Sequence, residues 1–181
     1  VKLHVFYDRA DLIHKAVTTV QNALIEATVL IVVLLVLFLG NLRAAVVVSL
    51  ILPFAAITTF LLMSVFGLTA NLMSLGGLAI AIGMLVDAAV VVVENTVESL
   101  SHHRAEGDIP KLHLIYRAVT EVSVPVVSGI IIICLVFLPL LSLQGLEGKL
   151  FAPVALTIIF ALSGSLILSL TLIPVIASLL L

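Results

Sequence analysis

The feature that most constrains this chain is a run of 43 residues, 44–86, that contains no charged side chain. One crossing of a bilayer needs about 20 apolar residues, so this run is long enough for two crossings. The whole chain is 63% hydrophobic and 10% charged, with a mean hydropathy of +1.42, whereas soluble domains have roughly 25% charged residues. A water-soluble core could not hide that much apolar surface. The sequence therefore predicts an all-α integral membrane protein.

Polar breaks in the sequence divide the apolar part of the chain into five expected membrane spans. Residues 1–21 are interpreted as the end of a β-strand from a water-exposed domain and a lead-in helix, and residues 22–181 as the transmembrane domain. One long polar loop is expected, at residues 99–120, and its part from Pro110 to Thr120 is expected to form a short surface helix. The spans are expected at about residues 24–42, 45–66, 72–97, 122–143 and 151–181.

The distribution of basic residues predicts the orientation. Lys and Arg are retained in cytoplasmic loops. Arg43, Arg104, Lys111 and Arg117 fall on one side of the predicted membrane, against Lys149 in the short loops of the other side. The 99–120 loop is therefore expected in the cytoplasm. The net charge of −2 gives no indication of a nucleic-acid partner.

A single carboxylate, Asp87, lies inside the apolar residues 75–93. A charged acid at mid-bilayer costs about 2.5–3.5 kcal/mol by insertion scales, and such acids are functional by default. On a helix it shares a stripe with Gly76, Ile80, Gly83 and Glu94, and small residues allow membrane helices to approach closely. We therefore expect Asp87 to face other helices. Because protonation or a cationic partner would lower the cost, Asp87 is the predicted proton carrier.

Two polar residues follow Asp87 toward the expected cytoplasmic end. Glu94 and Asn95 lie about two helical turns further along the chain. Both are candidates for a secondary role in a proton path. An acid at the membrane interface near a helix end is an equally good interpretation of Glu94.

The sequence from Gly83 to Asn95, GMLVDAAVVVVEN, resembles the fourth transmembrane helix of resistance–nodulation–division (RND) efflux pumps. Further motifs resemble the family in the right order, at residues 7–9, 38–45, 67–77 and 138–153. The resemblance implies a fragment covering helices two to six of a twelve-helix secondary active transporter, which is not an enzyme. It also implies a homotrimer in the bacterial inner membrane that exchanges protons for substrate without a cofactor. Its partners would be a periplasmic membrane-fusion adaptor and an outer-membrane channel.

Within the family, a single acid followed by Ala88 resembles the heavy-metal efflux branch rather than the drug-exporting branch, which has two adjacent acids. Ala81 and Ala88 occupy positions where the zinc/cobalt type usually has an acid and a glycine. The copper/silver type, which uses membrane methionines as soft ligands for its substrate metal, is the better match. Met73 falls on one such position and Met84 lies one residue from the other, which is Leu85 here, so Met73 and Met84 form a candidate metal relay.

Two alternatives to metal export remain open at this point. One is an RND exporter of organic compounds. The other is a non-transporting or protein-translocation relative of the same fold. The resemblance leaves the cationic partner of Asp87 and the substrate-binding residues outside this sequence.

Overall fold

The computed structural model describes residues 9–40, 42–103 and 110–180, so the predicted N-terminal strand lies outside the described residues. Each long element within that part is an α-helix, and all five are long and apolar enough to cross a membrane. This confirms the prediction of an all-α membrane protein. The helices are α1 (Arg9–Leu39), α2 (Leu42–Val65), α3 (Leu72–His103), α4 (Lys111–Leu141) and α5 (Gly145–Leu180).

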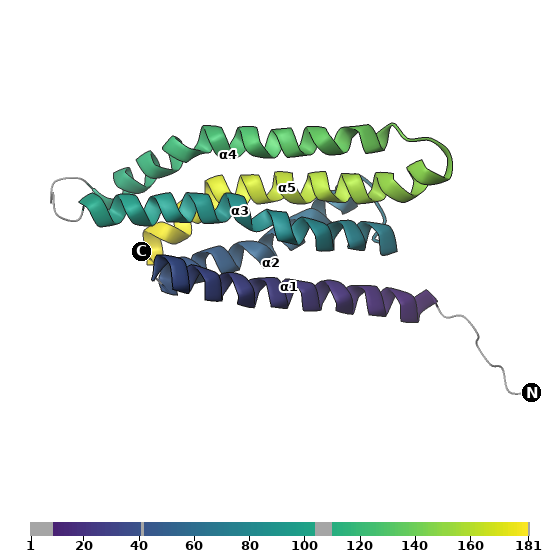
Figure 1. Cartoon of the computed structure of the whole chain (residues 1–181), viewed down its shortest axis with the longest axis horizontal. Helices are drawn as coiled ribbons and strands as arrows, with labels where there is room; N and C mark the ends of the chain where they lie inside the picture. Colours follow the sequence, from purple (N-terminus) through teal and green to yellow (C-terminus); the bar gives the residue numbers. More distant parts are fainter. Residues whose placement is uncertain (1–8, 41, 104–109, 181) are drawn as a thin grey trace, which may run out of the picture.

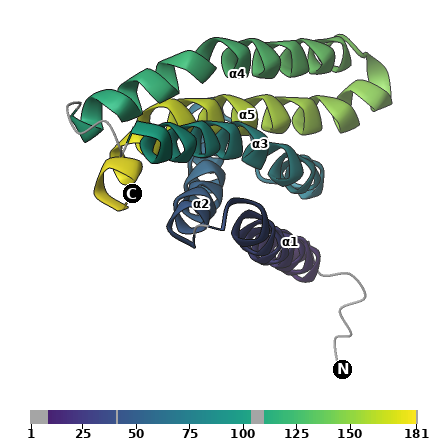
Figure 2. The same ribbon diagram turned by 60° about the vertical axis from the view of Figure 1, so that its left-hand side comes forward.

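The five helices run alternately in opposite directions, so that α1 begins and α5 ends on opposite sides of the bundle (Figure 1). α3 contacts all four other helices, whereas α1 packs only on α2 and α3, and α4 packs only on α3 and α5. Figure 2 shows α1 and α4 at the two edges, with α3 and α5 between them. α3 is therefore the central helix of the described part.

Turn chemistry separates α2 from α3. Gly67 has a φ of 69°, a left-handed conformation that glycine adopts without steric cost. The N–H of Gly67 donates to the Ser64 carbonyl and that of Leu68 to the Met63 carbonyl, which is the Schellman pattern of helix ends. Asn71 and Ser74 then exchange two hydrogen bonds of 2.8 and 2.9 Å, so the first turn of α3 is capped as in a capping box.

Glycine permits the close contact between the two most central helices. A Cβ placed on Gly77 of α3 would lie 2.8 Å from the backbone oxygen of Val154 on α5. Van der Waals contact of this kind is what holds membrane helices together, because lipid tails are as apolar as the side chains. Ser165 of α5 adds a 2.9 Å hydrogen bond to the Leu85 carbonyl of α3. These contacts fix α3 against α5.

The helices are longer than the spans expected from hydropathy. α1 continues without a break from the lead-in segment into the first span, as expected, but α3 runs on to His103 and α4 already begins at Lys111. Residues 99–103 of the expected loop thus continue α3, and residues 111–120 are helical, as expected for the part from Pro110 to Thr120, but as the start of α4. α4 is bent in Figure 2, and it contains Pro125, a residue type that lacks a backbone donor and kinks helices.

Candidate functional site

One face of the central helix is left open by the other four helices. Residues at steps of three and four along α3 are all exposed and lie on one side of the helix. We call this face the α3 stripe. It comprises Met73, Gly76, Ile80, Gly83, Asp87, Val91, Glu94 and Glu98.

The remainder of the membrane-length part of α3 is packed. Leu78, Ala81, Leu85 and Ala89 are at most 1% exposed, and they form one core with residues of α2 and α5. We expected Asp87 to face other helices, but it faces none of those described here. The helical spacing of the small residues predicted this stripe, and the expectation that Asp87 faces another helix stays a prediction for parts of the transporter outside this chain.

The carboxylate of Asp87 has no hydrogen bond or ion pair with any residue in the described ranges. Glu94 lies on the same stripe, seven residues and about 10 Å further along the helix axis. That separation is too long for direct proton transfer between the two carboxyl groups, since a hydrogen bond joins heavy atoms about 3 Å apart. Any path between them needs water or a further side chain.

Asn95 lies off the stripe and has a partner of its own. Its Nδ2 donates a 2.7 Å hydrogen bond to the carbonyl oxygen of Ala118 on α4, and the side chain is half-buried. This contact connects the ends of α3 and α4 near the expected cytoplasmic side. The predicted secondary role of Asn95 in a proton path stays a prediction.

The two candidate methionines do not form one metal site. Met73 is exposed at the start of α3, and Met84 is half-buried against the core. Eleven residues of helix separate them by about 16 Å, far beyond a shared metal ion. No group of three or more His, Cys, Asp or Glu side chains suited to a metal ion occurs in the part of the chain that the structure describes. A role of Met73 and Met84 in passing a metal ion stepwise along the helix stays a prediction.

Sequence reasoning missed the buried hydroxyl groups of α5. Thr157, Ser165 and Ser169 are at most 1% exposed. Thr157 bonds the Pro153 carbonyl at 2.7 Å and Ser165 bonds α3, whereas the Ser169 hydroxyl has no hydrogen-bond partner among the described residues. Their i, i+8 and i+12 spacing, counted from Thr157, could have indicated one helix face, but not which helix it meets.

Membrane-length helices around a central helix with an open acidic stripe define a multispan helical membrane protein. The chain belongs to the AcrB/AcrD/AcrF family, whose model matches residues 1–181. This confirms the resemblance to RND pumps that the motifs indicated.

The chain is similar to metal-resistance proteins throughout its length. It is 43% identical over 179 residues to "Cobalt-zinc-cadmium resistance protein CzcA" of Cupriavidus metallidurans, covering 96% of this chain and 17% of that protein. It is 36% identical over 181 residues to "Cation efflux system protein CusA" of Escherichia coli strain K12, covering 97% of this chain and 17% of that protein. The chain thus spans about a sixth of the length of these relatives.

The fold is similar to that of solved pumps. The crystal structure described as "a heavy metal efflux pump, crystal form I" matches with a TM-score of 0.76 at 37% identity, over 96% of this chain and 17% of that one. A second crystal form matches with a TM-score of 0.74 at 38% identity, over 93% of this chain and 17% of that one. The five-helix arrangement is therefore one that experimental structures also contain.

Proposed function

We propose that this chain is part of a proton-driven pump that exports heavy-metal cations, with Asp87 as the intramembrane proton carrier. The observation that carries the proposal is the α3 stripe. There the central helix presents Asp87, which has no partner among the described residues, on a surface with two glycines, and the other acids of the stripe, Glu94 and Glu98, lie nearer the helix end. The family and the names of the relatives, which are cation-efflux and metal-resistance proteins, support a metal cation as the exported substrate.

Energetics explains why this carboxylate would cycle between protonation states. Left against lipid, a charged Asp87 would cost about 2.5–3.5 kcal/mol on insertion scales. Gly83 lies about one turn before Asp87 on the same stripe and Gly76 about three turns before it, and a Cβ on either would meet no atom within 4 Å, so another helix of the complete transporter has room to approach. A cation on that helix would stabilise the ionised form. Its departure would favour protonation, which couples proton uptake to the conformation of the transporter.

Glu94 would carry the proton between Asp87 and the cytoplasmic end, with water bridging the gap of about 10 Å. Both acids lie on the α3 stripe, and both are exposed in the described bundle. The residues that bind the metal would lie in parts of the transporter outside this chain. Met73 and Met84 remain candidates for stepwise metal transfer within it.

The identity of the metal stays open. Ala81 and Ala88 favoured the copper/silver type, yet the relative named for cobalt, zinc and cadmium is 43% identical and CusA is 36% identical. Overall identity therefore does not support copper or silver over the other metals. We further propose the assembly of the family: a homotrimer in the bacterial inner membrane, working with a periplasmic adaptor and an outer-membrane channel.

The test is Asp87→Asn in the complete transporter, which removes the titratable proton and keeps the side-chain shape. We expect loss of metal resistance in the host strain and loss of metal uptake into inverted vesicles driven by a pH gradient, at wild-type expression. Glu147→Gln, in the first turn of α5, is the matched control and should retain both activities. Wild-type resistance and uptake in the Asp87→Asn variant would overturn the proposal.

The same vesicles discriminate between the alternatives. A pump for organic compounds would lose export of those compounds, not of metal, on Asp87→Asn substitution. A non-transporting relative would move neither substrate in the wild-type form. Copper, silver, zinc, cobalt and nickel are each offered separately, so the assay also identifies the metal.

A further inference from the structure

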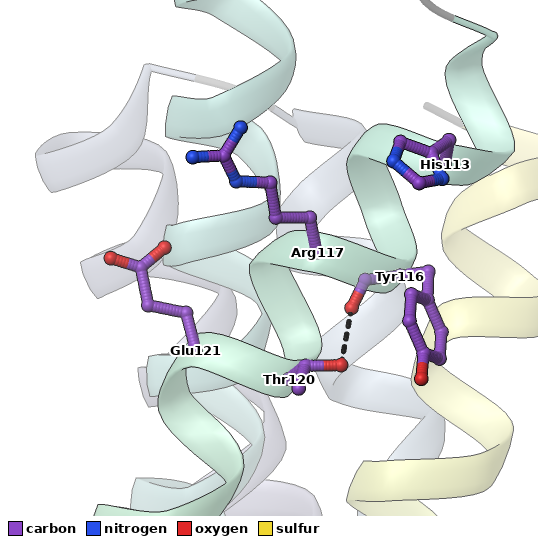
Figure 3. A pocket seen from close by; sticks show the side chains of 5 residues that line it. All are labelled: His113, Tyr116, Arg117, Thr120 and Glu121. Carbon is purple, nitrogen blue, oxygen red and sulfur yellow. Dashed lines mark hydrogen bonds between the residues drawn. The ribbon is translucent and has the colours of Figure 1, made fainter.

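An open cavity of about 450 Å³ lies along the first turns of α4. His113, Tyr116, Arg117, Thr120 and Glu121 line it. Figure 3 shows the charged groups of Arg117 and Glu121 on the same side of the helix. The Thr120 hydroxyl donates a 2.8 Å hydrogen bond to the Tyr116 carbonyl, so Arg117 and Glu121 are the charged recognition groups of the cavity, beside the His113 ring and the Tyr116 hydroxyl.

The two charges of the cavity do not neutralise each other. Neither Arg117 nor Glu121 forms an ion pair with any residue within 9–40, 42–103 or 110–180. They stand four residues apart with the cation nearer the N-terminus, and this is the weaker orientation for an i, i+4 pair on a helix. The cavity therefore presents one positive and one negative group, about one helical turn apart, to whatever occupies it.

The depth of these groups follows from the sequence of α4. Residues 122–141 carry no charge, and 20 helical residues span about 30 Å, the thickness of the hydrocarbon core. Glu121 then lies at the edge of that core, and Arg117 lies about 6 Å further out, within the headgroup layer. Tyr116 is 68% exposed beside them, as expected of an aromatic side chain at a membrane interface.

We propose that this cavity binds the headgroup of a zwitterionic phospholipid that carries a primary ammonium group. The Arg117 guanidinium would hold the phosphate, since its planar array of donors matches a phosphate group. The Glu121 carboxylate lies about one turn deeper, so it would accept hydrogen bonds from the ammonium group of a headgroup that bends back along α4 toward the hydrocarbon core. A purely anionic headgroup would be attracted by Arg117 and repelled by Glu121, so the charge pattern favours a ligand with both charges. The site is independent of the transported substrate.

The experiment uses the complete transporter in lipid nanodiscs that contain equal amounts of phosphatidylethanolamine and phosphatidylglycerol. Native mass spectrometry counts the lipids of each kind that remain bound after release. We expect the wild type to retain phosphatidylethanolamine in excess. Arg117→Gln should lower that retention several-fold, and Glu121→Gln should shift it toward phosphatidylglycerol.

Exchanging the charges of Arg117 and Glu121 gives the most discriminating variant. In the double variant R117E/E121R the acid precedes the base, which is the favoured orientation for an intrahelical ion pair. The two side chains would therefore pair with each other and release the lipid, although the residue composition of the cavity is unchanged. Lys149→Gln and Glu147→Gln, which remove one charge of each sign near the start of α5, are the matched controls and should keep wild-type retention.

Four results would overturn the proposal. Equal loss of both lipids in Arg117→Gln, with no effect of Glu121→Gln, would indicate a site for phosphate alone. Release of the lipid by added inorganic phosphate would identify a free anion as the ligand. An equal loss of phosphatidylethanolamine in Lys149→Gln would show that the retention depends on general surface charge and not on this cavity. Wild-type retention in R117E/E121R would show that the paired charges do not hold the headgroup.

Discussion

The contact between Gly77 and α5 makes a quantitative prediction about how this bundle is held together. A methyl group added by Gly77→Ala would lie 2.8 Å from the Val154 oxygen and 3.1 Å from its Cα, whereas ordinary contact begins at 3.4 Å. The obstructing atoms are backbone, so no side chain can rotate away. The two helices would have to separate by about 0.6 Å, which loses dispersion contacts along the whole α3–α5 interface.

Two opposing contributions determine how much Gly77→Ala changes the stability of the transporter. Overpacking of a well-packed interface costs about 1–3 kcal/mol, and replacing glycine by alanine inside a helix returns about 0.5–1 kcal/mol. The first term is larger, so Gly77→Ala should destabilise the transporter by about 0.5–2 kcal/mol per protomer. The unfolding midpoint of the complete transporter in detergent, followed by thermal scanning, measures the change.

The matched control is Gly129→Ala on α4. Gly129 is exposed inside a helix, and a Cβ there would meet no atom within 4 Å, so this variant receives the helix-propensity gain without the clash. Its midpoint should equal or exceed that of the wild type. If Gly77→Ala is as stable as Gly129→Ala, the close approach of α3 and α5 is not what holds these helices together, and the reasoning is refuted.

Three further substitutions test the remaining contacts with the same thermal assay. Ser165→Ala removes the interhelical bond to the Leu85 carbonyl and should cost about 0.5–1.5 kcal/mol; an unchanged midpoint would contradict this. Ser169→Ala removes a buried hydroxyl without a partner in the described part, so the midpoint should stay level or rise, and a fall would reveal an additional partner. Gly67→Ala forces a residue with a Cβ into a φ of 69° and should cost about 1 kcal/mol, with Gly67→Asn costing less because asparagine tolerates this conformation.

Hydropathy predicted the class of the protein correctly because the bilayer imposes a length on any element that crosses it. Five apolar segments were expected and five long helices are described. The ends of the helices were predicted less well. Hydropathy measures what lies inside the membrane, whereas α3 and α4 continue beyond it as helices, to His103 and from Lys111 respectively.

The sequence predicted which residues of the candidate site share a helix face, but not which other helices lie beside them. The period of 3.6 residues placed Asp87 and Glu94 on one stripe with Gly76, and all three are exposed on one face of α3. Neither the hydrogen bond of Asn95 to α4 nor the burial of Leu85 could be foreseen, because both depend on which helices lie beside α3.

The sequence by itself determined that this chain enters a membrane, how many helices it forms and which residues share a helix face, since these depend on local composition and helical geometry. Only the tertiary structure decided that α3 is central, that Gly77 lies against α5 and that Asp87 points away from every described helix. Small residues permit close packing on any face of a helix, and the face that is used depends on neighbours distant in the chain. An acid that composition marks as costly thus becomes a candidate site through what the fold leaves open around it.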